Sequence, residues 1–172
     1  MEQLIKDTNI TETHVAFWGG PFSNFATCTI EAEGHTFRSS EQYFMWQKAV
    51  YFRDDVIAQA ILDAKSPAQA KKLGRRVDGF NNEDWDKVKL NAMFNAVYLK
   101  FKQNENFKDL LLMEDIMDKD FVEGSPIDKI WGVGIAWDSR LIEDEGNWLG
   151  ENLLGKILNS VREALLKEKS TD

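Results

Sequence analysis

The chain of 172 residues has the length of one ordinary domain, and its 43% hydrophobic and 29% charged residues predict a soluble, folded globule. Its 29 acidic residues outnumber its 21 basic residues, which gives a net charge of -8. This balance argues against a generally basic surface for nucleic acid or for anionic membranes, although a local basic patch stays open.

Cysteine usage and hydropathy predict a cytoplasmic protein. Cys28 is the only cysteine, which excludes a disulfide within the chain and disfavours a cysteine-based zinc or iron–sulfur site. Residues 1–7 hold no apolar signal region, and the apolar runs are far too short to span a bilayer. We therefore expect a cytoplasmic, reducing environment and no membrane partner.

The first third of the chain predicts a few short strands. Residues 1–13 are polar and indicate a loose lead-in. Residues 14–18 read as a strand that Gly19-Gly20-Pro21 ends. Residues 27–31 and 35–37 are expected to pair as a small hairpin, because Glu33-Gly34 suits a tight turn.

The rest of the chain is mainly helical in pattern. Ser39 with Gln42 and Ser66 with Gln69 have the spacing of capping boxes, and Pro67 suits a first helical position. Helices are expected, in chain order, at residues 39–52, 54–64, 66–74, 82–102, 107–113 and 149–167. Residues 121–123 predict a strand, residues 124–147 a long ordered loop, and residues 167–172 a frayed tail. The sequence therefore predicts one α+β domain over residues 1–172, predominantly helical, with a small N-terminal β-hairpin.

Several common catalytic sites are missing from the sequence. His14 and His35 lack a third metal-ligand pattern, so no metal site is expected. The chain contains no HExxH, GxxxxGK[ST] or GxSxG motif, and Gly132-Val133-Gly134 lacks the helix of a dinucleotide fingerprint. Metal-dependent hydrolysis, nucleotide hydrolysis and Ser-His catalysis are therefore poorly supported, and no cofactor is expected.

The first unusual feature is a pair of opposite charges on one helix face. Glu41 and Lys48 share that face with Phe44, Met45 and Phe52. Seven residues separate the two charges by about 10 Å along the axis, which is enough to bracket a small ligand. The alternative is a partly exposed face whose charged side chains reach past apolar surface to water.

Two further segments have residue types that suit a nucleotide. Phe22-Ser23-Asn24-Phe25 could cradle a flat base, or could be a turn anchored to the core by its rings. Lys71, Lys72, Arg75 and Arg76 form the densest basic cluster, which suits a phosphate or, equally, a solvated helix end.

Two C-terminal segments also carry candidate binding residues. In residues 123–134, Trp131 could stack on a base and Asp128 could act as a base or acceptor, or the loop is a tight turn with a buried Trp. Asn152, near the start of the last helix, could bind a ligand or cap the helix. Gly155 inside that helix indicates a closely packed neighbour.

These pieces, in this order, resemble the YbiA-like or NADAR domain family over residues 16–166. The matching segments are Gly20-Pro21-Phe22-Ser23-Asn24-Phe25, Ser40-Glu41-Gln42-Tyr43-Phe44 with Lys48-Ala49, Ala70-Lys71-Lys72-Leu73-Gly74-Arg75, Trp85, Lys100-Phe101, residues 123–134, and Asn152-Leu153-Leu154-Gly155 with Arg162. One departure is Asn159 after Leu158, where the family often has Met, and it bears on packing or on the wall of a pocket.

The resemblance implies a compact, helix-rich α+β fold and an N-glycosidase. The substrate would be a small molecule with a phosphorylated ribose joined to nitrogen, such as an aminopyrimidine ribotide of riboflavin synthesis or a molecule derived from NAD or ADP-ribose. Nucleic acid would be a partner only as an ADP-ribosylated substrate. Binding of an NAD-derived nucleotide without cleavage stays open as an alternative.

The resemblance also implies a catalytic lysine at Lys48. Cleavage of an N-glycoside builds positive charge at C1′, which Glu41 or Asp128 could stabilise. A neutral Lys48 could instead form a Schiff base with an opened ribose, because its apolar neighbours would lower its pKa. We expect Trp131 and Phe22 to hold the base, and Arg75 with the nearby lysines to bind the phosphate. The other expected substrate-binding residues are Ser23, Asn24, Gly132 and Asn152.

Overall fold

The structure, a computed structural model, describes residues 5–170, and these residues fall into two units. Residues 1–23 and 106–172 form the first, which we call the sheet unit, and residues 24–105 form the second, the helical unit. The fold is α+β and predominantly helical, as the sequence predicts. The assignment of residues 1–172 to a single domain stays a prediction.

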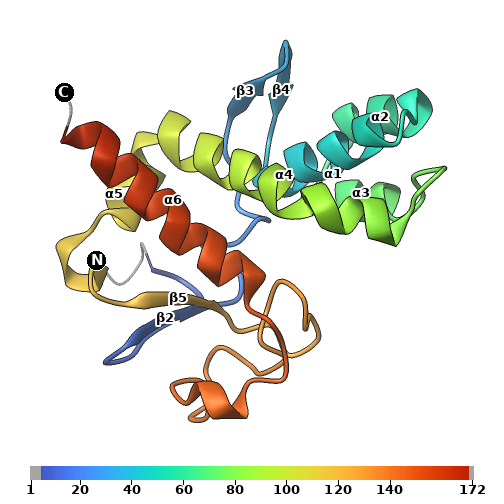
Figure 1. Cartoon of the computed structure of the whole chain (residues 1–172). Coiled ribbons are helices and arrows are strands. Elements are labelled where there is room, and N and C mark those ends of the chain that lie inside the picture. Colours follow the sequence, from blue (N-terminus) through green and yellow to red (C-terminus); the bar gives the residue numbers. More distant parts are fainter. Residues whose placement is uncertain (1–4, 171–172) are drawn as a thin grey trace. The chain divides into compact units, whose positions relative to one another are not determined.

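The sheet unit is built on three short strands. These are β1 (Thr8–Ile10), β2 (His14–Phe17) and β5 (Asp120–Glu123), in the order β1-β2-β5. The central strand β2 runs antiparallel to β1 and parallel to β5, with Val15 opposite Phe121. Helix α6 (Leu153–Lys169) packs along β5 (Figure 1). The helix α5 (Glu105–Leu111) and two single 3₁₀ turns, Glu114–Ile116 and Glu145–Asn147, complete this part of the chain.

The long loop after β5 closes the core of the sheet unit. Ala16 and Val122 of the strands are buried with Val133 and Ile142 of the loop, and three further loop side chains pack against them: Ile135, Trp137 and Trp148. The loop is therefore ordered, as expected, because its apolar side chains fill the space beside the strands.

The helical unit surrounds α1. It contains the hairpin β3 (Ile30–Ala32) and β4 (His35–Phe37), followed by α1 (Ser40–Tyr51), α2 (Asp55–Leu62), α3 (Pro67–Gly74) and α4 (Asn82–Gln103). Helices α2, α3 and α4 all pack on α1 (Figure 1). The predicted hairpin is confirmed, since Glu33 and Gly34 take φ values of 52° and 76°, as a type I′ turn requires.

The expected helix starts in this unit are confirmed by their caps. The Ser39 hydroxyl accepts the Gln42 N–H at 3.0 Å, and the Ser66 hydroxyl accepts the Gln69 N–H at 3.1 Å. Each side-chain oxygen satisfies a backbone donor that the first helical turn leaves without a helical partner. Because both caps are local in sequence, they fix where α1 and α3 begin.

Several predicted boundaries were wrong: the strand expected at residues 27–31 is Ile30–Ala32, and the short helix expected at 107–113 is Glu105–Leu111. Three further differences are at the two ends of the chain. Residues 8–10 form β1 rather than a loose lead-in, because β2 offers an edge on which they pair; residues 1–4 lie outside the described part. The last helix begins at Leu153, since residues 149–152 bond instead to the backbone of residues 129–133. It also continues to Lys169, so the predicted fraying at 167–169 is absent, and residues 171–172 lie outside the described part.

Among residues 5–170, no helix combines the length and the apolar character needed to cross a bilayer.

Candidate functional site

One polar group of the helical unit with unusual surroundings is the amine of Lys48. Its Nζ donates to the carbonyl oxygen of Gly74 at 2.9 Å and lies 4.1 Å from the centre of the Phe80 ring. Burial lowers the pKa of Lys48 from its usual value, nearby Arg75 lowers it further, and Glu41 opposes the shift. A lysine in these surroundings has a larger neutral fraction near pH 7 than an exposed one, and a neutral amine is a nucleophile.

Glu41 lies near the start of the same helix and is only 6% exposed. Its backbone N–H donates to the carbonyl of Asn24 at 3.1 Å, and the Ser40 hydroxyl donates to the side-chain oxygen of Asn24 at 2.9 Å. The first turn of α1 is thereby fixed to residue 24. Asn24, expected to bind substrate, has its side chain between Ser40 and the sulfur of Met93, so its observed contacts hold the segment in place.

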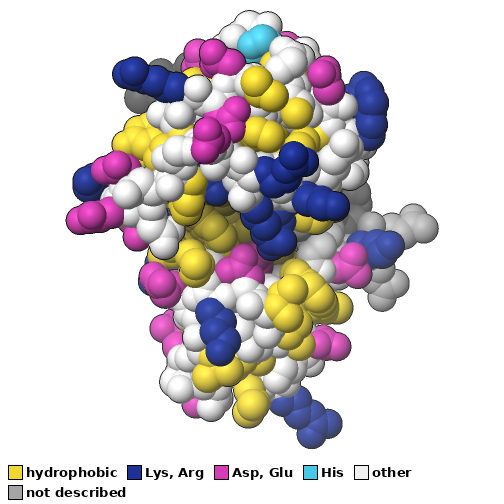
Figure 2. Space-filling view, turned by 90° about the vertical axis from the view of Figure 1, so that its right-hand side faces the viewer, with side chains coloured by type: hydrophobic (Ala, Val, Ile, Leu, Met, Phe, Trp, Pro, Cys, Tyr) yellow, Lys and Arg dark blue, Asp and Glu magenta, His cyan; other side chains and the backbone are white. Residues whose placement is uncertain are grey.

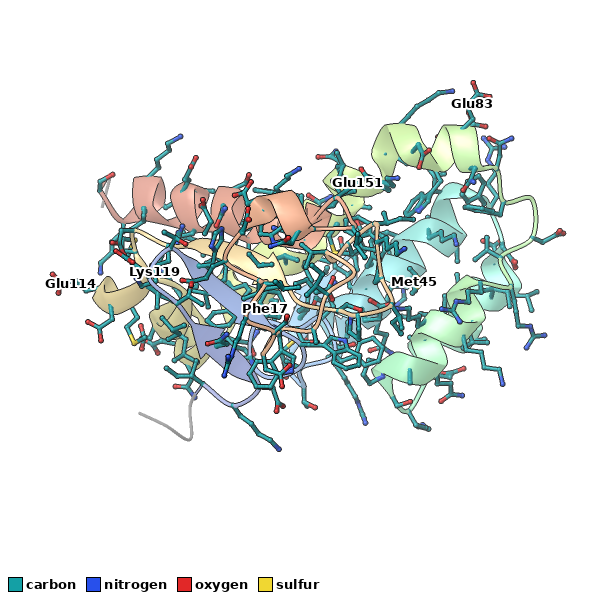
Figure 3. The ribbon with its side chains drawn as sticks, turned by 90° about the horizontal axis from the view of Figure 1, so that it is seen from below. Phe17, Met45, Glu83, Glu114, Lys119 and Glu151 are labelled. Carbon is teal, nitrogen blue, oxygen red and sulfur yellow. The ribbon has the colours of Figure 1, made fainter. Side chains whose placement is uncertain are left out.

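Gly74 brings the end of α3 close to Lys48. A Cβ atom built on Gly74 would lie 2.0 Å from the Met45 sulfur, so only glycine fits without movement of Met45. Figure 3 shows Met45 where α1 faces α3. Gly74 is also the last residue of α3, as predicted, so its carbonyl lies at the negative end of the helix dipole. The close approach of the two helices thus supplies the acceptor for the Lys48 amine.

The basic cluster lies at the end of α3. Arg75 and Arg76 are exposed and follow the helix, Lys72 is exposed on its last turn, and Lys71 has its Nζ 5.7 Å from the centre of the Phe25 ring. Figure 2 shows Lys and Arg side chains gathered together on the face it displays. Arg75 is near enough to Lys48 to lower its pKa, which links the cluster to the amine.

Phe22 and Ser23 belong to the sheet unit. Phe22 is only 2% exposed and packs between Phe17 and Phe121, with ring centres 6.0 and 4.9 Å away. Figure 3 labels Phe17, which ends β2. This burial favours the alternative that the sequence left open for Phe22, a turn anchored to the core. The Ser23 N–H closes that turn by donating to Gly20 at 3.3 Å.

Asp128, Trp131 and Gly132 form one tight turn. An oxygen of Asp128 accepts the N–H groups of Ile130 and Trp131, both at 2.9 Å. A Cβ atom on Gly132 would lie 2.8 Å from the Glu123 carbonyl, so this position is closely packed. These contacts favour a structural role for Asp128 and Gly132, while Trp131 remains partly exposed on the same turn.

Asn152 joins α6 to β5. It takes a left-handed conformation with φ 53°, and its side chain accepts the Glu123 N–H at 3.0 Å and donates to the Phe121 carbonyl at 2.9 Å. It therefore continues the hydrogen bonding of the strand and does not cap the helix through its side chain. Gly155 allows this contact, because its Cβ would lie 2.1 Å from the Phe121 carbonyl.

Asn159, the departure noted in the sequence, also binds β5. Its side-chain oxygen accepts the Phe121 N–H at 3.1 Å, and its amide donates to Asp120 at 2.9 Å. Arg162 donates to the Ile116 carbonyl at 2.9 Å and lies over the Phe121 ring. Asn159 thus affects packing of the strand, which is one of the two effects expected of it.

The structure gathers some of the predicted residues within each unit. In the helical unit, Arg75 and Glu41 both act on the pKa of Lys48, in opposite directions. In the sheet unit, Asp128, Trp131 and Gly132 share a turn, and Asn152 donates its backbone N–H to Gly132.

Sequence reasoning missed Phe80, which contacts Lys48. Phe80 is the only ring in the polar stretch of residues 78–84, and this was the available signal. It also treated Gly74 only as a helix stop, whereas the Gly74 carbonyl binds the Lys48 amine. Both contacts join residues far apart in sequence, so local patterns do not reveal them.

No group of three or more His, Cys, Asp or Glu residues that could hold a metal ion occurs within residues 5–170. The candidate site of the helical unit consists of a partly buried amine, a buried carboxylate and a basic helix end.

Residues 14–166 match the family model of the NADAR domain. "Protein irg-1" of Caenorhabditis elegans is 39% identical over 152 residues, which cover 87% of this chain and 71% of that protein. An N-glycosidase of Acanthamoeba polyphaga mimivirus is 41% identical over 125 residues, covering 73% of this chain and 72% of that protein.

The same comparison extends to a solved structure. "N-glycosidase YbiA" of Escherichia coli is 32% identical over 169 residues, covering 98% of this chain and 96% of that protein. The NMR structure of E. coli YbiA superposes with a TM-score of 0.76 at 31% identity, covering 97% of this chain and 93% of that one. With a family match over nearly its whole length and the same fold as a relative, this chain belongs to the NADAR domain family.

Proposed function

We propose that this protein is an N-glycosidase that hydrolyses the bond between a phosphorylated ribose and a base. Relatives over most of its length are named N-glycosidases, which supports a hydrolase acting on N-glycosyl compounds. The observation that carries the proposal within this chain is the Lys48 amine, whose pKa burial lowers and which lies on the same helix as the buried Glu41.

In the proposed reaction, the neutral Lys48 amine adds to C1′ of the ribose. The bond from C1′ to the base nitrogen breaks, the ring opens, and the two protons lost from the amine pass to the base and to the ring oxygen. The product is a Schiff base between Lys48 and C1′. Water then hydrolyses this imine, which releases the ribose phosphate as an aldehyde and restores the amine. Glu41 is the proposed acid–base group for these proton transfers.

Arg75 is the proposed ligand of the substrate phosphate. Its guanidinium is exposed at the end of α3, where it can bind two phosphate oxygens at once. Trp131 belongs to the sheet unit, where its ring is partly exposed on an ordered turn, and its stacking on a base stays a prediction from the sequence. Phe22 is left out because it is packed in the core of the sheet unit.

The substrate class decides between three activities. An aminopyrimidine ribotide, NAD with ADP-ribose, and ADP-ribosylated DNA would each be incubated with the purified protein, and the products identified by mass spectrometry. We expect release of a free base and a ribose phosphate from the first, with activity unchanged by a metal chelator. Release from ADP-ribosylated DNA alone would favour the nucleic-acid activity. Binding without product from any substrate would contradict the enzyme and favour a nucleotide-binding protein.

A further inference from the structure

The loop between α3 and α4 places an exposed aromatic ring over the Lys48 amine. Phe80 is 42% exposed, so the hydrophobic effect alone gives it little reason to take one position. Its ring nonetheless has the Lys48 Nζ 4.1 Å from its centre and packs edge-on against Phe52 with ring centres 5.4 Å apart. Lys48 lies on α1, and Phe52 is the residue that follows the last turn of that helix.

Hydrogen bonds on either side of Phe80 fix the loop. One oxygen of the Asp54 carboxylate accepts the Asp78 N–H at 2.8 Å. Its other oxygen caps α2 by accepting the Ile57 N–H at 3.0 Å. Asn81 caps α4 by accepting the Asp84 N–H at 2.9 Å. The backbone is thus fixed at Asp78, two residues before Phe80, and at Asn81, the residue after it.

The turn between these anchors also needs glycine. Gly79 has φ 68°, a left-handed conformation that a side chain disfavours, although a Cβ there would meet no atom closer than 3.9 Å. Glycine is therefore favoured at this position for its backbone conformation, and not because a neighbouring atom leaves no room for a side chain. It turns the backbone so that the next residue, Phe80, faces Lys48.

We propose that Phe80 is a positioning residue for Lys48, whose ring covers the amine and holds it against the Gly74 carbonyl. The inference rests on the proposed function, in which Lys48 is the nucleophile. The ring acts in two ways. It excludes water from the amine, which favours the neutral form, and its negative face attracts the ammonium, which favours the charged form. Burial is the largest cause of the lowered pKa of Lys48, so we expect the exclusion of water to outweigh the attraction to the ring.

The charged groups around the amine are accounted for. Arg75 at the end of α3 lowers the pKa of Lys48, and Glu41 on α1 raises it. The acids in the first turns of the neighbouring helices are Asp55 on α2 and Glu83 and Asp84 on α4. All of these remain in the Phe80 variants below, so a change in Lys48 ionisation there reports on the ring. Asp54→Ser also removes the Asp54 carboxylate, and loss of a negative charge can only lower the midpoint, which opposes the expected rise.

The test measures the ionisation of Lys48 without relying on catalysis. Competitive labelling of lysines with acetic anhydride over a range of pH, read by mass spectrometry, gives the midpoint at which Lys48 becomes reactive. We expect Phe80→Ala to raise this midpoint by about half to one pH unit, because water reaches the amine. Phe80→Leu keeps the apolar cover but removes the ring, so its midpoint should not rise.

Two further variants sharpen the test. Asp54→Ser keeps an oxygen that can cap α2 but is too short to reach the Asp78 N–H. The loop that carries Phe80 is then less firmly held over the amine, so the labelling midpoint of Lys48 should rise, as in Phe80→Ala. Phe25→Ala is the matched control: Phe25 is also 42% exposed and lies over a different lysine, Lys71. It should leave the Lys48 midpoint unchanged. An unchanged midpoint in Phe80→Ala would overturn the inference.

Activity separates this inference from the proposed function. With the aminopyrimidine ribotide, Phe80→Ala should lower kcat about three- to tenfold at pH 7, with KM changed less than twofold, and raising the pH should restore kcat. A raised labelling midpoint without loss of kcat would confirm the effect of Phe80 on the amine. That result would overturn the catalytic role of Lys48.

Discussion

Lys48 shows how one side chain acquires its character from contacts that its own helix does not supply. The sequence places Lys48 in an apolar stripe of α1, but the groups that touch its amine are the Gly74 carbonyl of α3 and the Phe80 ring of the following loop. Burial among these groups, with the nearby charge of Arg75, lowers the pKa of Lys48 from its usual value.

Lys48→Arg should abolish base release, because a guanidinium stays protonated and cannot form an imine. Borohydride added during turnover should trap a ribosyl adduct on Lys48 in the wild type and none in the variant, as judged by peptide mass spectrometry. Glu41→Gln should slow the reaction by about 10²- to 10⁴-fold with the adduct still formed. Substantial activity in Lys48→Arg, or an adduct on another lysine, would contradict the covalent role.

Arg75→Ala should raise KM by about 10- to 100-fold, since it removes a charged contact to the phosphate. It should also raise the pH at which the rate rises, because Arg75 helps to lower the pKa of Lys48. Arg75→Lys restores the positive charge. Its KM and its pH dependence should therefore lie between those of Arg75→Ala and those of the wild type. Lys72→Ala is the comparison on the same helix and should change KM less. The measurement is steady-state kinetics over pH, and an unchanged KM in a folded Arg75→Ala protein would contradict the assignment.

At the scale of elements, glycines and one residue in the left-handed backbone conformation determine which helices and strands pack closely. Gly74 lets α3 approach α1, and Gly155 lets α6 approach β5. Asn152 adds two hydrogen bonds to β5 at the start of α6. Two kinds of position therefore set how closely these helices pack. At Gly74 and Gly155 no side chain separates the neighbouring segments, and at Asn152 the side chain takes the place of a strand's hydrogen-bond partner.

Gly74→Ala should destabilise the protein by about 1–3 kcal/mol, because the new Cβ overlaps the Met45 sulfur. Urea denaturation measures this free energy of unfolding. Met45→Ala makes room for the new methyl group, so the double variant should be less destabilised than the sum of the two single variants. Strict additivity would show that the two positions are not in contact.

Asn152→Ala should destabilise the protein by about 2–4 kcal/mol, because it leaves the Glu123 N–H and the Phe121 carbonyl without this partner. Asn152→Asp keeps the acceptor for Glu123 but loses the donor to Phe121. Hydrogen exchange at the Glu123 amide should therefore be faster in the alanine variant and nearly unchanged in the aspartate variant. Equal exchange in both variants would contradict the role of the side-chain oxygen.

At the scale of the whole molecule, stability is linked to pH through Lys100. This side chain lies on α4, is only 1% exposed, and has its pKa lowered by burial to about 8, against a partial opposing effect from Cys28. Between about pH 8 and 10.5 the unfolded chain keeps a proton that the folded protein has lost. The free energy of unfolding should therefore rise with pH across this window, by about 3 kcal/mol in total.

Lys100→Met should remove that rise, because methionine fills a similar volume without a charge. Urea denaturation at pH 7 and pH 10 measures the difference between the two proteins. Lys65→Met, at an exposed position, is the control and should keep the wild-type pH dependence. If Lys100→Met and the wild type gain stability equally between these pH values, Lys100 does not carry the effect.

The sequence by itself determined the features that depend on near neighbours in the chain. Ser39 and Ser66 each accept the N–H of the residue three positions ahead and so begin a helix, Glu33-Gly34 forms the turn of a hairpin, and acids follow the start of the long helix. These features follow from local hydrogen bonds and residue spacing, which can be inferred from a single sequence. The ordered motifs also placed the chain in its family.

Only the tertiary structure decided the features that join distant residues. The pairing of β2 with β5 spans about a hundred residues, the extended run before α6 depends on backbone partners in residues 129–133, and Phe80 meets Lys48 only because α3 ends beside α1. Each of these depends on which surfaces come together when the apolar side chains are buried, and a local pattern carries no information about a partner that far away. Sequence patterns likewise predicted binding roles for Phe22 and Asn152 and a catalytic role for Asp128, and the tertiary structure adds that their side chains contact the core, a strand and a turn.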